Sequence, residues 1–178
     1  MRLALTFLAA AALAACASGP MNTAGRADTM LPEPVRAPAG QRALMTAAAT
    51  GELTYECRDK KSMAGQHEWV FVGPVATLYG ADRKLVGKYY AGPTWESTDG
   101  SKVTGKQVAV APGRAGSIPL QLVKAEPATG GRGAMTGVNY IQRINTRGGV
   151  APAAPCNEAS KGTRQQVPYA ADYVFYGA

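Results

Sequence analysis

Most of the chain alternates apolar and polar residues in short runs that end at turn residues. Leu53, Tyr55 and Cys57 alternate with polar neighbours, which is the pattern of a half-buried strand. The same reasoning predicts strands at residues 68–72, 75–79, 85–90, 94–97, 102–111, 117–124, 134–146 and 172–176. No long stretch holds a helical period, and turn signals recur about every eight to twelve residues. The pattern therefore predicts an all-β fold, as a single antiparallel β-sandwich or β-barrel domain.

The segment 88–105 carries the densest group of aromatic, acidic and turn residues. Two tight turns, at Gly92-Pro93 and Asp99-Gly100, enclose a short strand with Trp95 on one face and Glu96 on the other. We expect this segment and a later polar strand to form a ligand-facing surface, because aromatics beside amides, carboxylates and an arginine suit sugar or peptide recognition. The candidate surface comprises Tyr90, Trp95, Glu96, Asp99, Ser101, Tyr140, Gln142, Arg143 and Asn145. The structural alternative is that Trp95 fills the core and Glu96 neutralises Arg143.

The first sixteen residues predict a lipoprotein signal peptide. A short positive start and an apolar run lead into Leu13-Ala14-Ala15-Cys16, which matches the bacterial lipobox. Lipidation of Cys16 with diacylglycerol and a further acyl chain such as palmitate would anchor the protein in a membrane. Ala17 stands where an aspartate would retain a lipoprotein in the inner membrane, so we expect the outer membrane of a Gram-negative cell envelope. The alternative is an ordinary secretory signal that happens to contain a cysteine.

Composition divides the rest of the chain into a tether and a folded domain. Residues 17–51 are small, proline-bearing and weakly hydrophobic, which predicts a flexible tether with a possible short helix over 41–48. Residues 52–178 are expected to form the β-domain. In an exported protein the remaining cysteines, Cys57 and Cys156, are expected to form a disulfide, with two separate buried thiols as the alternative.

The residue inventory argues against a standard enzyme. His67 is the only histidine of the chain and is expected to lie solvated in a loop, so the sequence offers too few ligands for a zinc site. A Ser-His-Asp triad would have to use His67, and the chain contains no Gly-x-Ser-x-Gly nucleophile elbow. No phosphate-binding or dinucleotide motif occurs, and no cofactor is expected. Glu96 and Asp99 remain as a carboxylate pair for a hydrolase. The alternative is that Asp99 caps the Asp99-Gly100 turn and Glu96 pairs with a nearby basic side chain. The formal net charge of +7 comes from scattered basic residues, and we expect no nucleic-acid partner.

Several segments resemble one known family. WVFVGPVATLYG, YYAGPTWESTDGSKVTG, SIPLQLV, GVNYIQRINTRGG and VPYAADYVFY occur in order over about residues 52–178. These segments are similar to the family known as domain of unknown function 3455, whose members are exported proteins of bacteria and fungi. In that family a histidine often precedes the Tyr-Ala-Gly-Pro-Thr-Trp-Glu run, where this chain has Tyr89. The resemblance therefore implies an exported β-domain and no particular mechanism.

These observations predict a non-catalytic envelope lipoprotein that binds a glycan, peptidoglycan or a protein partner through the Trp95 segment. One alternative is a lysozyme-inhibitor-like lipoprotein. Such inhibitors also begin with a Tyr-x-Cys strand, here Tyr55-Glu56-Cys57, and Ser101 and Lys102 would then enter the lysozyme cleft. The other alternative is the carboxylate-dependent hydrolase.

Overall fold

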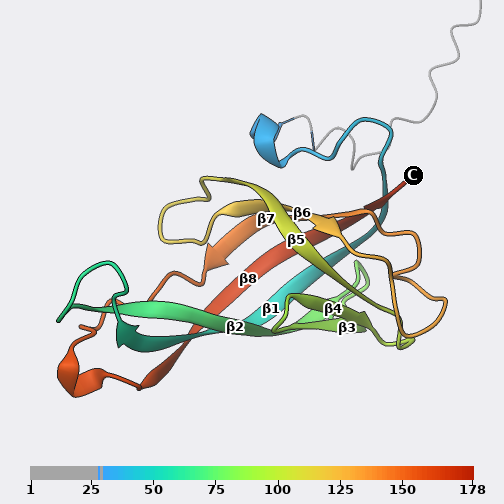
Figure 1. Cartoon of the computed structure of the whole chain (residues 1–178). Helices are drawn as coiled ribbons and strands as arrows, with labels where there is room; N and C mark the ends of the chain where they lie inside the picture. The colour runs from blue at the N-terminus through green and yellow to red at the C-terminus, as the bar shows by residue number, and fades with distance from the viewer. Residues whose placement is uncertain (1–27, 29) are drawn as a thin grey trace, which may run out of the picture.

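The protein is a closed antiparallel β-barrel, seen in a computed structural model that describes residue 28 and residues 30–178 (Figure 1). Every strand pairs with its neighbours in the chain, and β1 also pairs with β8 to close the barrel. In the described residues the strands are β1 (Arg42–Asp59), β2 (His67–Tyr79), β3 (Leu85–Tyr90), β4 (Thr94–Ser97), β5 (Lys102–Ala111), β6 (Leu120–Ala125), β7 (Tyr140–Gly148) and β8 (Arg164–Gly177), with the 3-10 helices η1 (Glu33–Val35) and η2 (Glu158–Ser160). The all-β prediction is confirmed. Of the two architectures that it left open, sandwich and barrel, the structure has the barrel.

Strand limits agree best where turn residues enclose a strand on both sides. The predicted limits of β3, β4 and β5 are those observed. The predicted strands 68–72 and 75–79 are instead one strand, β2, which continues through Gly73-Pro74. Pro74 cannot donate a ladder hydrogen bond, and it lies directly before Val75, where the pairing with β3 ends.

β1 begins ten residues before the expected domain start at residue 52. The segment 41–48, considered as a short helix, is extended and pairs with β8 from Arg42 onward. Its alanines provide the reason, since Ala47 and Ala49 point into the barrel core, where pairing and burial outweigh a weak helical propensity. Gly51 lets β1 cross close to β2, because a Cβ there would collide with the carbonyl of Val75 and with Ala76.

The interior of the barrel is filled by alternate residues of its strands. On β8, Tyr169, Ala171, Tyr173 and Phe175 are all buried and belong to one core cluster. The cluster continues through Leu53, Leu78, Tyr89, Trp95, Val103, Val123, Met135 and Ile141 from the other strands and the loop before β7. The interior is therefore a packed core, as expected for a small eight-stranded barrel, and in this chain it is rich in aromatic residues.

A smaller cluster covers part of the outside of the barrel. Val35 of η1 is fully buried against Ala111 of β5 and Leu122 of β6, and Figure 1 shows η1, in blue, beside these strands. Part of the segment expected to be a tether is therefore packed on the barrel.

The disulfide between Cys57 of β1 and Cys156 is present, with 5.5 Å between the two Cα atoms, and this prediction is confirmed. Within the described residues no helix has both the length and the apolar character needed to cross a bilayer. Cys16 and its lipobox lie outside the described residues.

Candidate functional site: a cavity at one mouth of the barrel

One mouth of the barrel opens where the β3–β4 hairpin ends. β2 pairs with β3 only over Val75–Tyr79, and β5 pairs with β4 only over Lys102–Thr104. The remaining lengths of β2 and β5 extend past the hairpin and leave a cavity of about 300 Å³ between them. Its lining consists of Phe71, Val72, Gly73, Pro74, Tyr89, Gly92, Pro93, Trp95, Gln107, Gln121, Val123 and Arg143. We call this space the mouth cavity.

Two stacked aromatic side chains form the floor of the mouth cavity, and a third packs against them in the core. Tyr89 stacks on Trp95 with ring centroids 4.7 Å apart and 18° between the planes, and Tyr173 contacts both rings at 5.2 and 5.5 Å. The alternation of β3, β4 and β8 directs all three side chains inward. Trp95 is fully buried, and its Nε1–H has no hydrogen-bond acceptor in the described part of the chain. The floor therefore contains a buried N–H donor that no described residue uses.

Arg143 of β7 brings the only charged side chain to this lining. Its Nε and Nη2 atoms donate to the carbonyl of Pro119 at 3.3 and 3.0 Å. No carboxylate of the described residues forms an ion pair with it. The cavity thus holds a cation whose counter-charge the described chain does not supply.

The tyrosine hydroxyls near Arg143 are protonated at neutral pH. Burial raises the pKa of Tyr173 well above its usual range, and the Arg143 cation offsets a part of this. Burial likewise raises the pKa of Tyr89, with the same opposing effect of Arg143. Both residues therefore remain neutral phenols, which can donate hydrogen bonds and add no negative charge to the cavity.

Glu96 lies outside this cavity, against the expectation that it would share a patch with Arg143. Its carboxylate accepts from Tyr90 Oη at 2.6 Å and lies 3.3 and 3.9 Å from the Nζ atoms of Lys88 and Lys102. The bond from Tyr90 and the two lysines hold the pKa of Glu96 below its usual value. Adjacent residues of a strand face opposite sides, so Glu96 neutralises these lysines on the outer surface.

Asp99 and Ser101 stabilise the β4–β5 turn and the loop before β7. Asp99 Oδ1 accepts from the backbone and hydroxyl of Ser101 at 2.9 and 2.6 Å, and Oδ2 accepts from Ala134 N at 2.7 Å. These bonds lower the pKa of Asp99 to about 2. Ser101 is fully buried, so in this conformation it does not reach a partner's cleft as the inhibitor alternative requires. Neither residue belongs to the mouth cavity, which corrects their placement in the candidate surface.

The remaining predicted residues lie elsewhere on the outside of the barrel. Gln142 Nε2 donates to Val35 O at 2.6 Å and to Asp28 Oδ1 at 2.7 Å, while Tyr140 packs against the outer cluster. Asn145 Nδ2 donates to Asp172 Oδ2 at 2.7 Å. The predicted residues therefore do not form a single patch: Trp95 and Arg143 line one cavity, and the other members lie elsewhere.

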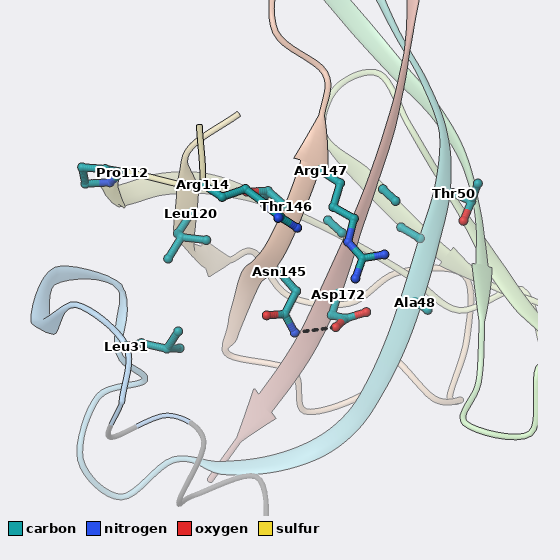
Figure 2. Close-up of a pocket in the computed structure, with 14 residues that line it drawn as sticks. Leu31, Ala48, Thr50, Pro112, Arg114, Leu120, Asn145, Thr146, Arg147 and Asp172 are labelled. Atoms are coloured by element: carbon teal, nitrogen blue, oxygen red, sulfur yellow. Dashed lines mark hydrogen bonds between the residues drawn. The ribbon is translucent and has the colours of Figure 1, made fainter. Parts of the chain in front are cut away.

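Asn145 lies in a second, outer pocket of about 460 Å³, which Figure 2 shows. The N-terminal segment contributes Leu31, and Arg147 lies beside the bonded pair of Asn145 and Asp172. Asp172 supplies a negative charge in the same lining as Arg114 and Arg147. This pocket is thus less strongly biased toward one charge than the mouth cavity.

Sequence reasoning missed Tyr89 and Phe71 as lining residues of the mouth cavity, and it missed Tyr173 as the residue that packs against the floor. Tyr169 and Tyr173 are four residues apart on a strand, so period-two alternation indicates that they share a face. The same rule places Gln142 and Arg143 on opposite faces. The contribution of Phe71 depends on how far β2 extends past β3, which local pattern does not reveal.

The fold and the cavity together define a small antiparallel β-barrel with an aromatic, cationic mouth. A family model described as protein of unknown function (DUF3455) matches residues 38–177, and the chain belongs to this family. The matched range begins just before β1 and includes every strand. No curated protein and no solved structure matches the chain.

Proposed function

We propose that this protein is a lipid-anchored binding protein of the cell envelope that holds a small organic anion in its mouth cavity, without catalysis. The observation that carries the proposal is the Arg143 guanidinium, which lines the cavity without a carboxylate partner among the described residues. A half-enclosed cation of this kind favours a carboxylate that its fork of N–H groups can bind.

The walls indicate what the rest of the ligand resembles. Phe71, Val72 and Pro93 provide apolar surface, and Gln107 and Gln121 provide amides that can fix an orientation. A volume of about 300 Å³ lies at the small end of ligand pockets. These features support a compact carboxylate with an apolar body, such as an aromatic acid, more than a polysaccharide chain.

The absence of catalysis is supported by the use of the two carboxylates that a hydrolase would need. Glu96 is bound to Tyr90 and paired with Lys88, and Asp99 is bound to Ser101 and to the backbone of Ala134. Neither carboxylate lines the mouth cavity. Lipid anchoring rests on the lipobox at Cys16.

Calorimetric titration with benzoate, and with neutral benzamide of the same shape, tests the proposal. We expect benzoate to bind and benzamide to bind at least tenfold more weakly, because only the anion pairs with Arg143. Arg143→Met should weaken benzoate binding at least tenfold, because it removes the guanidinium and keeps an unbranched apolar side chain. Arg147→Met is the matched control, since this arginine lies on the same strand but outside the cavity, and its binding should equal that of the wild type.

Two outcomes would overturn the proposal. One is equal binding of benzoate and benzamide. The other is wild-type affinity for benzoate in Arg143→Met, which would place the anion somewhere else. Circular dichroism of each variant distinguishes a lost site from a lost fold.

A further inference from the structure

A second constellation lies at the end of the β1–β2 hairpin and involves no residue of the mouth cavity. Asp59 and His67 are the last residue pair of the β1–β2 ladder, and Glu158 begins η2. One ligand atom from each of the three residues lies within 4.8 Å of the other two. The backbone bonds between Cys57 and residues 162 and 163, together with the disulfide, hold η2 beside this hairpin.

His67 is the part of this cluster that indicates a ligand. Its side chain is only 7 % exposed, although the sequence predicted a solvated loop histidine. Nε2 lies 2.9 Å from Glu158 Oε2 and 3.3 Å from Asp59 Oδ1, yet neither approach has hydrogen-bond geometry, and this buried nitrogen makes no hydrogen bond with the described residues. A buried imidazole nitrogen that makes no hydrogen bond and faces two carboxylate oxygens is placed as a metal ligand would be.

We propose that Asp59, His67 and Glu158 form a binding site for a divalent transition-metal ion, with Zn²⁺ as the ion that fits best. Zinc takes imidazole nitrogen and carboxylate oxygen at about 2.0–2.2 Å in tetrahedral geometry, which separates neighbouring ligand atoms by about 3.4 Å. The Nε2–Oδ1 separation of 3.3 Å already agrees with this spacing. The Glu158 side chain is 82 % exposed and free to open the shorter 2.9 Å separation.

The charges of the site are consistent with a bound cation. Two carboxylates face the imidazole, and Lys161 Nζ lies 2.8 Å from Asp59 Oδ2, the oxygen that does not face His67. Lys161 therefore competes with the metal for the charge of Asp59 and leaves Oδ1 to coordinate. The sequence predicted no metal site because it contains a single histidine, and the two carboxylates come close to it only in the folded chain. A bound ion would link η2 to the β1–β2 hairpin, close to the disulfide.

The competing explanation is an ion-pair network in which a protonated His67 bridges the two carboxylates. Equilibrium dialysis of the EDTA-treated full-length protein against Zn²⁺, followed by metal analysis, separates the two explanations. We expect one Zn²⁺ per chain. His67→Asn and Glu158→Gln should each weaken binding at least tenfold, as losses of a direct ligand do. Zn²⁺ at a hundredfold excess over Kd should raise the Tm of the wild type by about 5 °C or more.

Lys161→Met also distinguishes the two explanations. Under the metal proposal this variant removes the competing cation and should tighten Zn²⁺ binding about two- to fivefold. Because the chain has one histidine, the single imidazole resonance pattern in nitrogen-15 spectra reports directly whether Nε2 takes the metal.

The proposal is overturned if no Zn²⁺ is retained, if His67→Asn and Glu158→Gln retain wild-type affinity, or if the imidazole signals do not respond to Zn²⁺. Should His67→Asn fail to fold, Glu158→Gln still decides the question, because its side chain is mostly exposed.

Discussion

The ring of Tyr89 stacks on the indole of Trp95 with centroids 4.7 Å apart, and these two residues come from adjacent strands at paired positions. Directly opposed aromatics are among the strongest cross-strand pairs, worth about 0.5–1.5 kcal/mol beyond the apolar area that they bury. Here the pair also forms the floor of the mouth cavity. The same contact therefore serves both the core and the proposed site.

Replacing Trp95 tests how much of the stability depends on this stack. Trp95→Ala should lower the free energy of unfolding by about 3–5 kcal/mol, because it leaves a large cavity in the core. Trp95→Phe should cost about 1–2 kcal/mol, since it keeps a ring on Tyr89 and removes the buried Nε1–H that has no acceptor. Urea unfolding measures the free energy of unfolding of both variants and of the wild type. Trp95→Ala with the stability of the wild type would show that the indole is not a core residue.

Asp99 should make stability depend on acidic pH. Its pKa in the folded protein is about 2, below the ordinary value of 3.8, so the ionised carboxylate stabilises the fold above about pH 4. This contribution should disappear as the pH falls toward 2. The Tm difference between wild type and Asp99→Asn should therefore be largest near neutral pH and shrink between pH 4 and pH 2. A difference that stays constant over this range would contradict the assignment.

Gly133→Ala offers an independent test of the same carboxylate. A Cβ at this position would lie 2.5 Å from Asp99 Oδ2, so the methyl group displaces the carboxylate from the loop before β7. We expect this variant to show the same reduced dependence on acidic pH as Asp99→Asn.

The sequence predicted the strands whose limits depend on local pattern, and it did not predict the strand whose formation depends on distant pairing. β3, β4 and β5 were predicted with their limits because turn residues enclose them and their alternation is local. The first half of β1 was missed because its alanines and threonines alternate only weakly, and its strand state depends on pairing with β8, more than 100 residues away in the chain.

At the site, residue type identified Trp95 and Arg143, and the structure brings both to one cavity. The sequence analysis also grouped Glu96 and Gln142 with these two residues. Glu96 follows Trp95 and Gln142 precedes Arg143, so strand alternation directs both side chains to the opposite face of the sheet. The sequence analysis expected His67 to be solvated, and the structure shows a buried side chain beside Glu158. Local pattern could not predict this contact, because Glu158 is far away in the chain.

Lipid attachment at Cys16 stays a prediction, because this residue lies outside the described part of the chain. Cys16→Ala removes the thiol that would carry the acyl chains, so the protein should leave the membrane fraction for the soluble fraction or accumulate unprocessed. Cell fractionation and mass spectrometry of the N-terminus measure this. Unchanged membrane association of Cys16→Ala would exclude the anchor.

Gln142 should hold the N-terminal segment onto the barrel. Its fully buried amide donates to Val35 O and Asp28 Oδ1 and accepts from Tyr176 Oη at 3.1 Å. Gln142→Leu keeps a similar volume but leaves the Val35 carbonyl and the Tyr176 hydroxyl without this partner, at about 1–3 kcal/mol for each buried group. We therefore expect a lower free energy of unfolding and release of η1 from β5 and β6.

Limited trypsin digestion detects that release, because Arg36 follows η1 directly and is exposed. Cleavage after Arg36 should be faster in Gln142→Leu than in wild type, while the barrel itself remains resistant. Gln166→Leu makes the same chemical change at an exposed position of β8 and should leave the cleavage rate unchanged. Equal rates in Gln142→Leu and Gln166→Leu would show that packing of Val35 alone, rather than the buried amide, holds the segment in place.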